Sequence, residues 1–150
     1  MMKALIVEDE LLESVALVHI LRTYYQDIFT QVLSARDGQE AIATVKREEP
    51  DLVFMDINLP VLNGLEASKH ICAHYPNIKI IMISAYSDYL HLRESMRNNA
   101  VDYIVKPYSV ETLREAVGRV LVKTEKVELY GKGAVVERAK NYLETHYSQN

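Results

Sequence analysis

The pattern of apolar and polar positions alternates between two kinds of segment along the chain. Short, almost continuously apolar runs are typical of strands buried on both faces of a sheet. They predict strands over residues 4–7, 52–55, 78–83 and 101–105, with a weaker candidate over 30–34. Between these runs, apolar residues recur every three or four positions, as on one face of a helix. These stretches predict helices over residues 11–25, 39–49, 65–74 and 88–99, and another that begins after Ser109.

Turn and capping residues support these bounds. Pro50 and Pro76 each follow a predicted helix and end it, because proline cannot continue the helical hydrogen bonds. Gly38 and Gly64 stand where the chain turns into a helix, and Ser109 can cap the last one. Five strand–helix pairs in this order predict an α/β fold, with a doubly wound, five-stranded parallel sheet and helices on both faces.

Chemically useful side chains follow four of the five predicted strands. In such sheets ligands bind beyond the carboxyl ends of the strands, which meet at one edge. Acids come directly after the first strand and the third, a hydroxyl after the fourth and an amine after the fifth. These residues are Glu8, Asp9, Glu10, Asp56, Ser84 and Lys106.

Several carboxylates in one pocket repel each other, and a hard divalent cation compensates their charge. Mg²⁺ prefers oxygen ligands, commonly one or two carboxylates with waters and phosphate oxygens. Glu8, Asp9 and Asp56 fit that requirement, and the backbone carbonyl of Asn58 is a further candidate. A carboxylate near a metal and a lysine can also attack phosphorus and form an aspartyl phosphate. Lys106 would then offset charge on the phosphoryl oxygens.

Composition and charge narrow the class of protein. A hydrophobic fraction of 49% with 25% charged residues is typical of globular chains and excludes a disordered one. The formal net charge of −4 argues against non-specific nucleic-acid binding, which needs a basic face. Cys72 is the single cysteine, so no internal disulfide is possible. The apolar run at residues 4–7 is too short for a signal peptide or a membrane span. We therefore expect a soluble, cytoplasmic protein with no membrane partner.

Five elements in register give the chain a resemblance to a known family. They are Val7-Glu8-Asp9-Glu10, Met55-Asp56-Ile57-Asn58-Leu59-Pro60, Asn63-Gly64, Ile83-Ser84-Ala85 and Tyr103-Ile104-Val105-Lys106-Pro107. In order and spacing they resemble the receiver domain of two-component response regulators over about residues 3–124. The resemblance implies a flavodoxin-like fold with strand order 2-1-3-4-5.

The resemblance also implies a role for each matching residue. Asp56 would accept a phosphoryl group from a sensor histidine kinase, and Lys106 would pair with that group. Ser84 would contact the phosphoryl group and shift toward it, and Tyr103 would rotate inward as the aromatic switch. The Lys106-Pro107 peptide bond would be cis.

For the metal, the resemblance implies Mg²⁺ held directly by Asp9 and Asp56. Glu8 would act through a water molecule, and the carbonyl of Asn58 would complete the protein ligands. Glu8 stands where many receivers have aspartate.

The family's output surface is formed by the fourth helix, the fifth strand and the fifth helix, and it commonly makes a homodimer when phosphorylated. Charged and polar candidates for that surface are Arg93, Arg97, Asp102, Tyr108, Arg114 and Arg119. Beyond promoting its own phosphorylation and dephosphorylation, such a domain is not expected to be an enzyme.

The last residues follow a different pattern. We expect the receiver domain to cover residues 1–126, a linker with Gly131 and Gly133 to follow, and a helix to cover 134–147. Residues 137–148 are similar to the opening helix of an AraC-type (YesN-like) helix-turn-helix domain. Residues 127–150 are thus expected to be a linker and the first helix of a DNA-binding domain whose remainder is absent. DNA would be bound only through that missing part.

Three other interpretations stay open or are disfavoured. A stand-alone receiver acting through protein–protein contacts is the main alternative to a transcriptional regulator. A phosphatase of the dehalogenase type is disfavoured, because its nucleophile follows the first strand and has another aspartate two residues on. A zinc site at His70, Cys72 and His74 is disfavoured, because Cys72 points elsewhere on the helix that carries the two histidines.

Overall fold

A computed structural model of the chain describes residues 2–85 and 102–128. The described residues fall into two units, one ending at Tyr108 and the other beginning at Ser109, and each is described by itself. The first unit contains a five-stranded sheet in the order β2-β1-β3-β4-β5. All four strand pairings are parallel. The predicted doubly wound sheet with order 2-1-3-4-5 is therefore confirmed. The strands are β1 (Met2–Val7), β2 (Phe29–Ala35), β3 (Leu52–Asp56), β4 (Lys79–Ala85) and β5 (Asp102–Lys106).

The described helices lie within one or two residues of the predicted ones where both can be compared. They are α1 (Leu11–Tyr24), α2 (Gly38–Glu48), α3 (Gly64–His74) and, in the second unit, α5 (Val110–Glu128). The helix predicted over residues 88–99 lies outside the described residues. Helix α5 includes the first two residues of the linker predicted to begin at Val127. No described helix is long and apolar enough to cross a membrane.

Side-chain caps explain where three of these helices begin. Asp37, Asn63 and Ser109 each accept a hydrogen bond from the backbone N–H three residues later, at 2.8, 2.9 and 3.1 Å. Such a bond satisfies one of the N–H groups that a first helical turn leaves free. At the other end of α2, Glu49 takes the left-handed conformation (φ 45°), and Pro50 follows it. Ser109 was predicted as a cap, and the structure adds Asp37 and Asn63. These caps and helix ends are local properties of the sequence.

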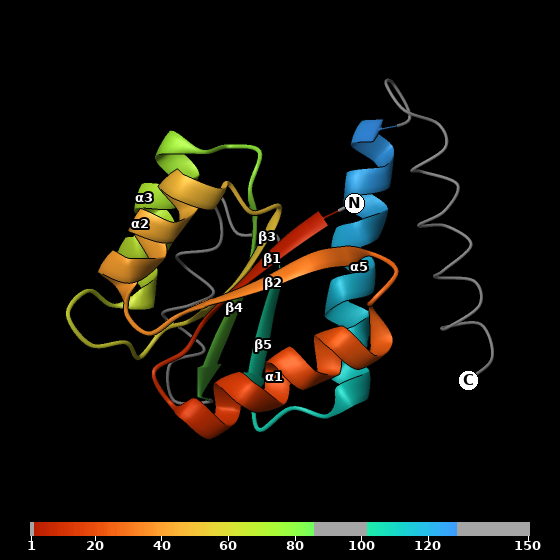
Figure 1. Cartoon of the computed structure of the whole chain (residues 1–150), viewed down its shortest axis with the longest axis horizontal. Helices are drawn as coiled ribbons and strands as arrows, with labels where there is room; N and C mark the ends of the chain where they lie inside the picture. Colours follow the sequence, from red (N-terminus) through yellow and green to blue (C-terminus); the bar gives the residue numbers. More distant parts are fainter. Residues whose placement is uncertain (1, 86–101, 129–150) are drawn as a thin grey trace. The chain divides into compact units, whose positions relative to one another are not determined.

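The core lies on both sides of the sheet. Helices α2 and α3 lie together on one side, and α1 lies on the other (Figure 1). Every residue of β3 is buried, as its continuous apolar run predicted. Leu17 and Leu21 of α1 are also buried. The cluster on the α2–α3 side contains Leu5, Val7, Ala35, Ala41, Val45, Val53, Met55, Ile57, Leu59, Ala67, Ile71, Ile78, Ile80 and Met82.

The strand register brings the chemically useful positions together. Val7, which precedes Glu8, lies beside Met55, which precedes Asp56. Asp56 is paired with Ile83, which precedes Ser84. Lys106 is paired with Ala85 on the far side of β4. Because the strands are parallel, these positions meet at one edge of the sheet, where the strands end.

Candidate functional site

Three carboxylates gather at this edge, as the sequence predicted. Glu8 and Asp9 follow β1, and Asp56 is the last residue of β3. One carboxylate oxygen from each lies within 4.8 Å of the others. Glu8 and Asp56 are buried, whereas Asp9 is exposed. Such a group of oxygens suits a hard divalent cation.

The Lys106 ammonium joins this group from the end of β5. Its Nζ lies 2.8 Å from Oε1 of Glu8 and 2.7 Å from Oδ2 of Asp56. A third carboxylate, Oε2 of Glu13 on α1, lies 2.7 Å from the same nitrogen. A lysine ammonium has three N–H donors. Each of the three donors therefore has a carboxylate acceptor.

Glu13 was not among the residues predicted from the sequence. The sequence signal for it is its place in the first turn of α1, a helix that starts directly beyond β1 at the edge where the acids gather. Acids in a first helical turn are common for another reason, since they interact favourably with the helix dipole. The residue type and position alone therefore do not distinguish an active-site acid from an ordinary one.

Burial and mutual contact shift the titration of the cluster. Burial raises the pKa of Glu8 to about 9, hydrogen bonds with Glu13 and Asp56 act in the same direction, and Lys106 opposes them. Hydrogen bonds with Glu8 and then with Lys106 hold the pKa of Glu13 below its usual value. Burial lowers the pKa of Lys106, but its hydrogen bonds to Asp56, Glu13 and Glu8 raise it well above the usual value overall. The Lys106 ammonium therefore stays charged in this pocket.

Asp56 is held at both carboxylate oxygens. Its Oδ2 accepts from Lys106, and its Oδ1 accepts a 3.0 Å hydrogen bond from the backbone N–H of Asn58. Asn58 was predicted to supply its carbonyl to a metal, and that role stays a prediction. The structure adds a second role, because the Asn58 N–H orients the Asp56 carboxylate.

Ser84 is buried at the same edge, where the described residues offer its hydroxyl no hydrogen-bond partner. Its Oγ is fully buried and makes no hydrogen bond among the described residues. Buried polar atoms are nearly always hydrogen-bonded, so an unpaired one at a candidate site indicates a group that is supplied from outside. Ser84 makes no hydrogen bond to the carboxylates, in keeping with a role toward a further ligand.

Two other expectations concern β5. The Lys106-Pro107 peptide bond is cis, as predicted. Tyr103 is half-buried and packs against the hydrophobic cluster on the α2–α3 side of the sheet. Its predicted rotation as a switch is not tested by one conformation and stays a prediction.

Arg93 and Arg97, predicted for the output surface, lie outside the described residues.

The loop after Asp56 is tightly fitted. A Cβ on Gly64 would lie 1.9 Å from the backbone oxygen of Asp56, which explains why α3 begins with glycine. The Gly64 N–H donates to the carbonyl of Ile57 at 2.9 Å. Between them Val61 has φ 66°, a left-handed conformation that is rare for a β-branched residue. The loop thus combines close packing with local strain beside the candidate acceptor.

The structure also argues against a zinc site at His70, Cys72 and His74. The rings of His70 and His74 stack at 4.2 Å, and Nδ1 of His74 is bonded to the carbonyl of His70, so these exposed histidines are used within α3. Burial raises the pKa of Cys72, a direction that disfavours the thiolate needed for metal binding.

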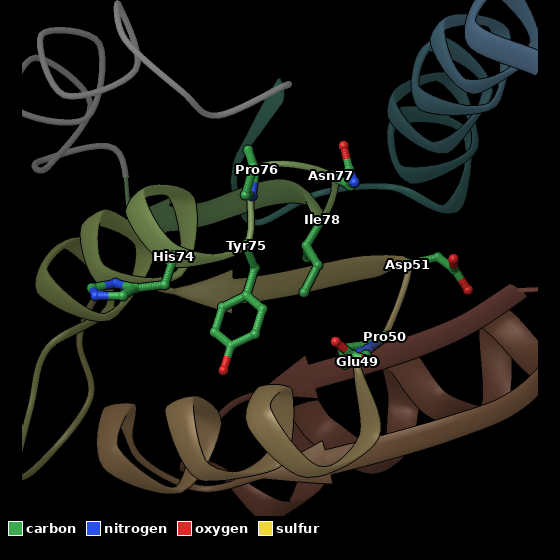
Figure 2. Close-up of a pocket in the computed structure, with 8 residues that line it drawn as sticks. All are labelled: Glu49, Pro50, Asp51, His74, Tyr75, Pro76, Asn77 and Ile78. Atoms are coloured by element: carbon green, nitrogen blue, oxygen red, sulfur yellow. The ribbon is translucent and has the colours of Figure 1, made fainter.

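A pocket lies at the opposite edge of the sheet, where β3 and β4 begin. It has a volume of about 310 Å³, and in Figure 2 His74 and Asp51 stand at its two ends. Asp51 Oδ2 already accepts from the Lys3 N–H at 2.8 Å. This pocket is therefore separate from the acidic edge. Its lining consists of Glu49, Pro50, Asp51, His74, Tyr75, Pro76, Asn77 and Ile78.

Comparison with known proteins identifies the class that this fold and site define. The family model described as the response regulator receiver domain matches residues 4–118. The chain therefore belongs to the response regulator receiver family. It is 33% identical over 117 residues to the transcriptional regulatory protein LnrK of Bacillus subtilis. That match covers 78% of this chain and 52% of LnrK, so the chain spans about half the length of this curated relative.

Solved structures give the same fold. One is a two-component transcriptional regulator AraC from Clostridium phytofermentans, with TM-score 0.69 and 27% identity, covering 81% of this chain and 96% of that one. Another is the receiver domain of the sensor histidine kinase PA1611 from Pseudomonas aeruginosa. Its TM-score is 0.67 with 27% identity, over 79% of this chain and 95% of that one. In that receiver domain a magnesium ion is coordinated in the active-site cleft.

Proposed function

We propose that this chain is a phosphorylation-dependent signalling switch whose acceptor is Asp56. The observation that carries the proposal is the contact of the buried Asp56 carboxylate with Lys106, inside a cluster that also contains Glu8 and Asp9. Receiver domains accept phosphoryl groups and interact with histidine kinases, and they are generally not enzymes beyond autodephosphorylation. We infer that a sensor histidine kinase is the donor for this chain.

The transfer requires one bond to form and one to break. An oxygen of Asp56 attacks the phosphorus of the donor's phosphohistidine. The phosphorus–nitrogen bond breaks, and the imidazole leaves with the electron pair and takes up a proton. Lys106 would neutralise charge on the transferred oxygens, and the Ser84 hydroxyl, which has no partner among the described residues, would donate to one of them. Ser84 and Lys106 then form the first contacts that report phosphorylation.

We propose Mg²⁺ as the cofactor. Glu8, Asp9 and Asp56 offer closely spaced oxygen ligands of the kind this ion prefers, with the Asn58 carbonyl as a further donor. When bound there, Mg²⁺ would offset negative charge on the phosphoryl oxygens. The related PA1611 receiver, with magnesium coordinated in its cleft, supports this assignment.

The kinase needs a surface beside Asp56 on which to dock. At the start of α1, close in sequence to the acids, Leu11, Leu12 and Val15 are exposed by 62%, 84% and 56%. Clustered exposed apolar side chains mark protein interaction sites. We infer that this turn of α1 contacts the phosphodonor, in the cytoplasm where response regulators typically act.

The output we propose is control of transcription. Tyr103 and the surface of β5 and α5 would respond when Ser84 and Lys106 move, and would favour a homodimer. A DNA-binding domain of AraC type would begin in residues 127–150. LnrK and the Clostridium protein are both named as transcriptional regulators, and the latter name includes AraC.

The direct test uses the purified chain and acetyl phosphate as the donor. Intact-mass measurement should detect one added phosphoryl group when Mg²⁺ is present and none when the metal is chelated. Equal labelling with and without the chelator would contradict the proposed role of Mg²⁺. Absence of labelling under conditions that label another receiver would contradict the proposed function itself.

A further inference from the structure

Glu13 differs from the other two carboxylates that contact Lys106. Its side chain is 49% exposed, whereas those of Glu8 and Asp56 are 7% exposed. The other two also accept hydrogen bonds from the backbone, Asp56 from the Asn58 N–H and Glu8 from the Glu10 N–H at 3.4 Å, whereas the further partner of Glu13 is the Glu8 side chain. Of the three acids, Glu13 can therefore most easily exchange its contact with Lys106 for contacts with water.

The number of donors limits what Lys106 can bind. Its three N–H groups face three carboxylates at 2.7 to 2.8 Å, so none is left for a phosphoryl oxygen. When a phosphoryl group arrives, Lys106 must release one acceptor. Asp56 is the proposed attachment point and Glu8 belongs to the proposed metal cluster, which leaves Glu13 as the acceptor to be released.

We propose that Glu13 is a positioning residue that holds Lys106 in the unphosphorylated pocket and opposes the phosphorylated state, a role that rests on the function proposed above. Breaking the Glu13–Lys106 ion pair is a cost that the phosphoryl group must offset. The Glu13 carboxylate also repels that group electrostatically. Both effects act in the same direction, so Glu13 makes the active state less favourable.

The role predicts opposite effects on two ligands. Replacing Glu13 by glutamine removes the charge but keeps the size of the side chain. The glutamine oxygen can at most accept a weaker, uncharged hydrogen bond from Lys106, so a phosphoryl analogue displaces it more easily and the affinity for that analogue should rise. Mg²⁺ alone is attracted by negative charge, so its affinity should stay the same or fall. A general disturbance of the pocket would instead lower the affinity for both ligands.

The experiment uses the full chain with Mg²⁺ alone and then with beryllium fluoride at saturating Mg²⁺. Amide NMR shifts report the first titration, and the bound ¹⁹F resonance reports the second. For Glu13→Gln, beryllofluoride should bind about two- to fivefold more tightly than to the wild type, the range expected for loss of a partly exposed ion pair. Glu66→Gln, an exposed acid on α3 that does not contact Lys106, is the matched control and should match the wild type.

The outcomes separate this inference from the function on which it rests. Beryllofluoride affinity that is unchanged or lower in Glu13→Gln would overturn the inference, and so would a gain in affinity for both ligands. Thermal unfolding of each variant shows whether the substituted chain is still folded. If the wild type itself gives no bound ¹⁹F resonance, the proposed function fails rather than the role of Glu13.

Discussion

The Lys106 ammonium nitrogen lies 2.7 Å from Oδ2 of Asp56, although 50 positions separate the two residues in the sequence. In the sheet, β4 lies between β3 and β5, so the lysine side chain reaches across the end of a neighbouring strand. The contact therefore ties together three strand ends at one point. Lys106 also compensates the charge of acids that would otherwise repel each other.

Lys106→Ala should lower stability in the absence of metal, because the acids that contact it lose their counter-charge. We expect the free energy of unfolding in chelator to fall by about 1.5–3 kcal/mol, the range for hydrogen bonds to charged groups. Mg²⁺ should restore part of that loss. Lys69→Ala is the control, since Lys69 and its partner Glu66 are both exposed. Equal unfolding midpoints for the Lys106 variant and the wild type in chelator would argue against this electrostatic role.

Asp9→Asn should weaken Mg²⁺ binding, because it removes a carboxylate from the three-membered cluster. We expect at least about a tenfold loss of affinity, since even residues that only support metal ligands contribute tenfold or more. Calorimetric titration with Mg²⁺ measures the effect. Asp51→Asn, at the opposite edge of the sheet, should bind like the wild type. If the two variants bind Mg²⁺ equally well, the metal lies elsewhere.

Gly64→Ala should destabilise the fold and disturb the acceptor. The added methyl group would lie 1.9 Å from the backbone oxygen of Asp56, so the loop or the helix must move. We expect a loss of about 1–3 kcal/mol in denaturant unfolding, as for other overpacked sites, together with slower phosphorylation. Glu66→Ala, at an exposed position of the same helix, is the comparison. A Gly64 variant as stable as Glu66→Ala would show that the loop adapts without cost.

Val61→Asn should stabilise the chain, because asparagine tolerates the left-handed conformation far better than valine does. Val61 is 74% exposed, so little buried surface is lost. We expect a gain of about 0.5–1 kcal/mol, part of the left-handed penalty of about 1–2 kcal/mol. The same exchange at Val15, exposed on helix α1, should change stability little, because valine and asparagine have similar helix propensities. The strain argument fails if both variants lose stability.

Much of the fold could be predicted because its signals are local. The apolar run of β3, the cap Ser109 and the helix end at Pro50 each depend on neighbouring residues alone. The meeting of Asp56, Ser84 and Lys106 at one edge of the sheet could be predicted because the carboxyl ends of parallel strands lie at the same edge. Strand β2 gave a weaker signal because much of it is partly exposed at the sheet edge.

What could not be predicted depends on orientation rather than on residue type. Glu13 reaches Lys106 because of how α1 is turned against the end of β1, and no spacing pattern encodes that rotation. The unpaired state of Ser84 likewise depends on which groups surround its hydroxyl. The backbone of Val61 is set by the closure of the loop between Asp56 and Gly64, against the preference of valine itself.

The central claim is that Asp56 is the phosphoryl acceptor, and mapping the modified residue tests it most directly. The chain is phosphorylated with acetyl phosphate and Mg²⁺, treated with borohydride to reduce the acyl phosphate to an alcohol, and analysed by peptide mass spectrometry. We predict homoserine at position 56 in the wild type and in the control Asp51→Asn, and no modified residue in Asp56→Asn. Modification at another carboxylate in the wild type, or undiminished phosphorylation of Asp56→Asn, would contradict the account.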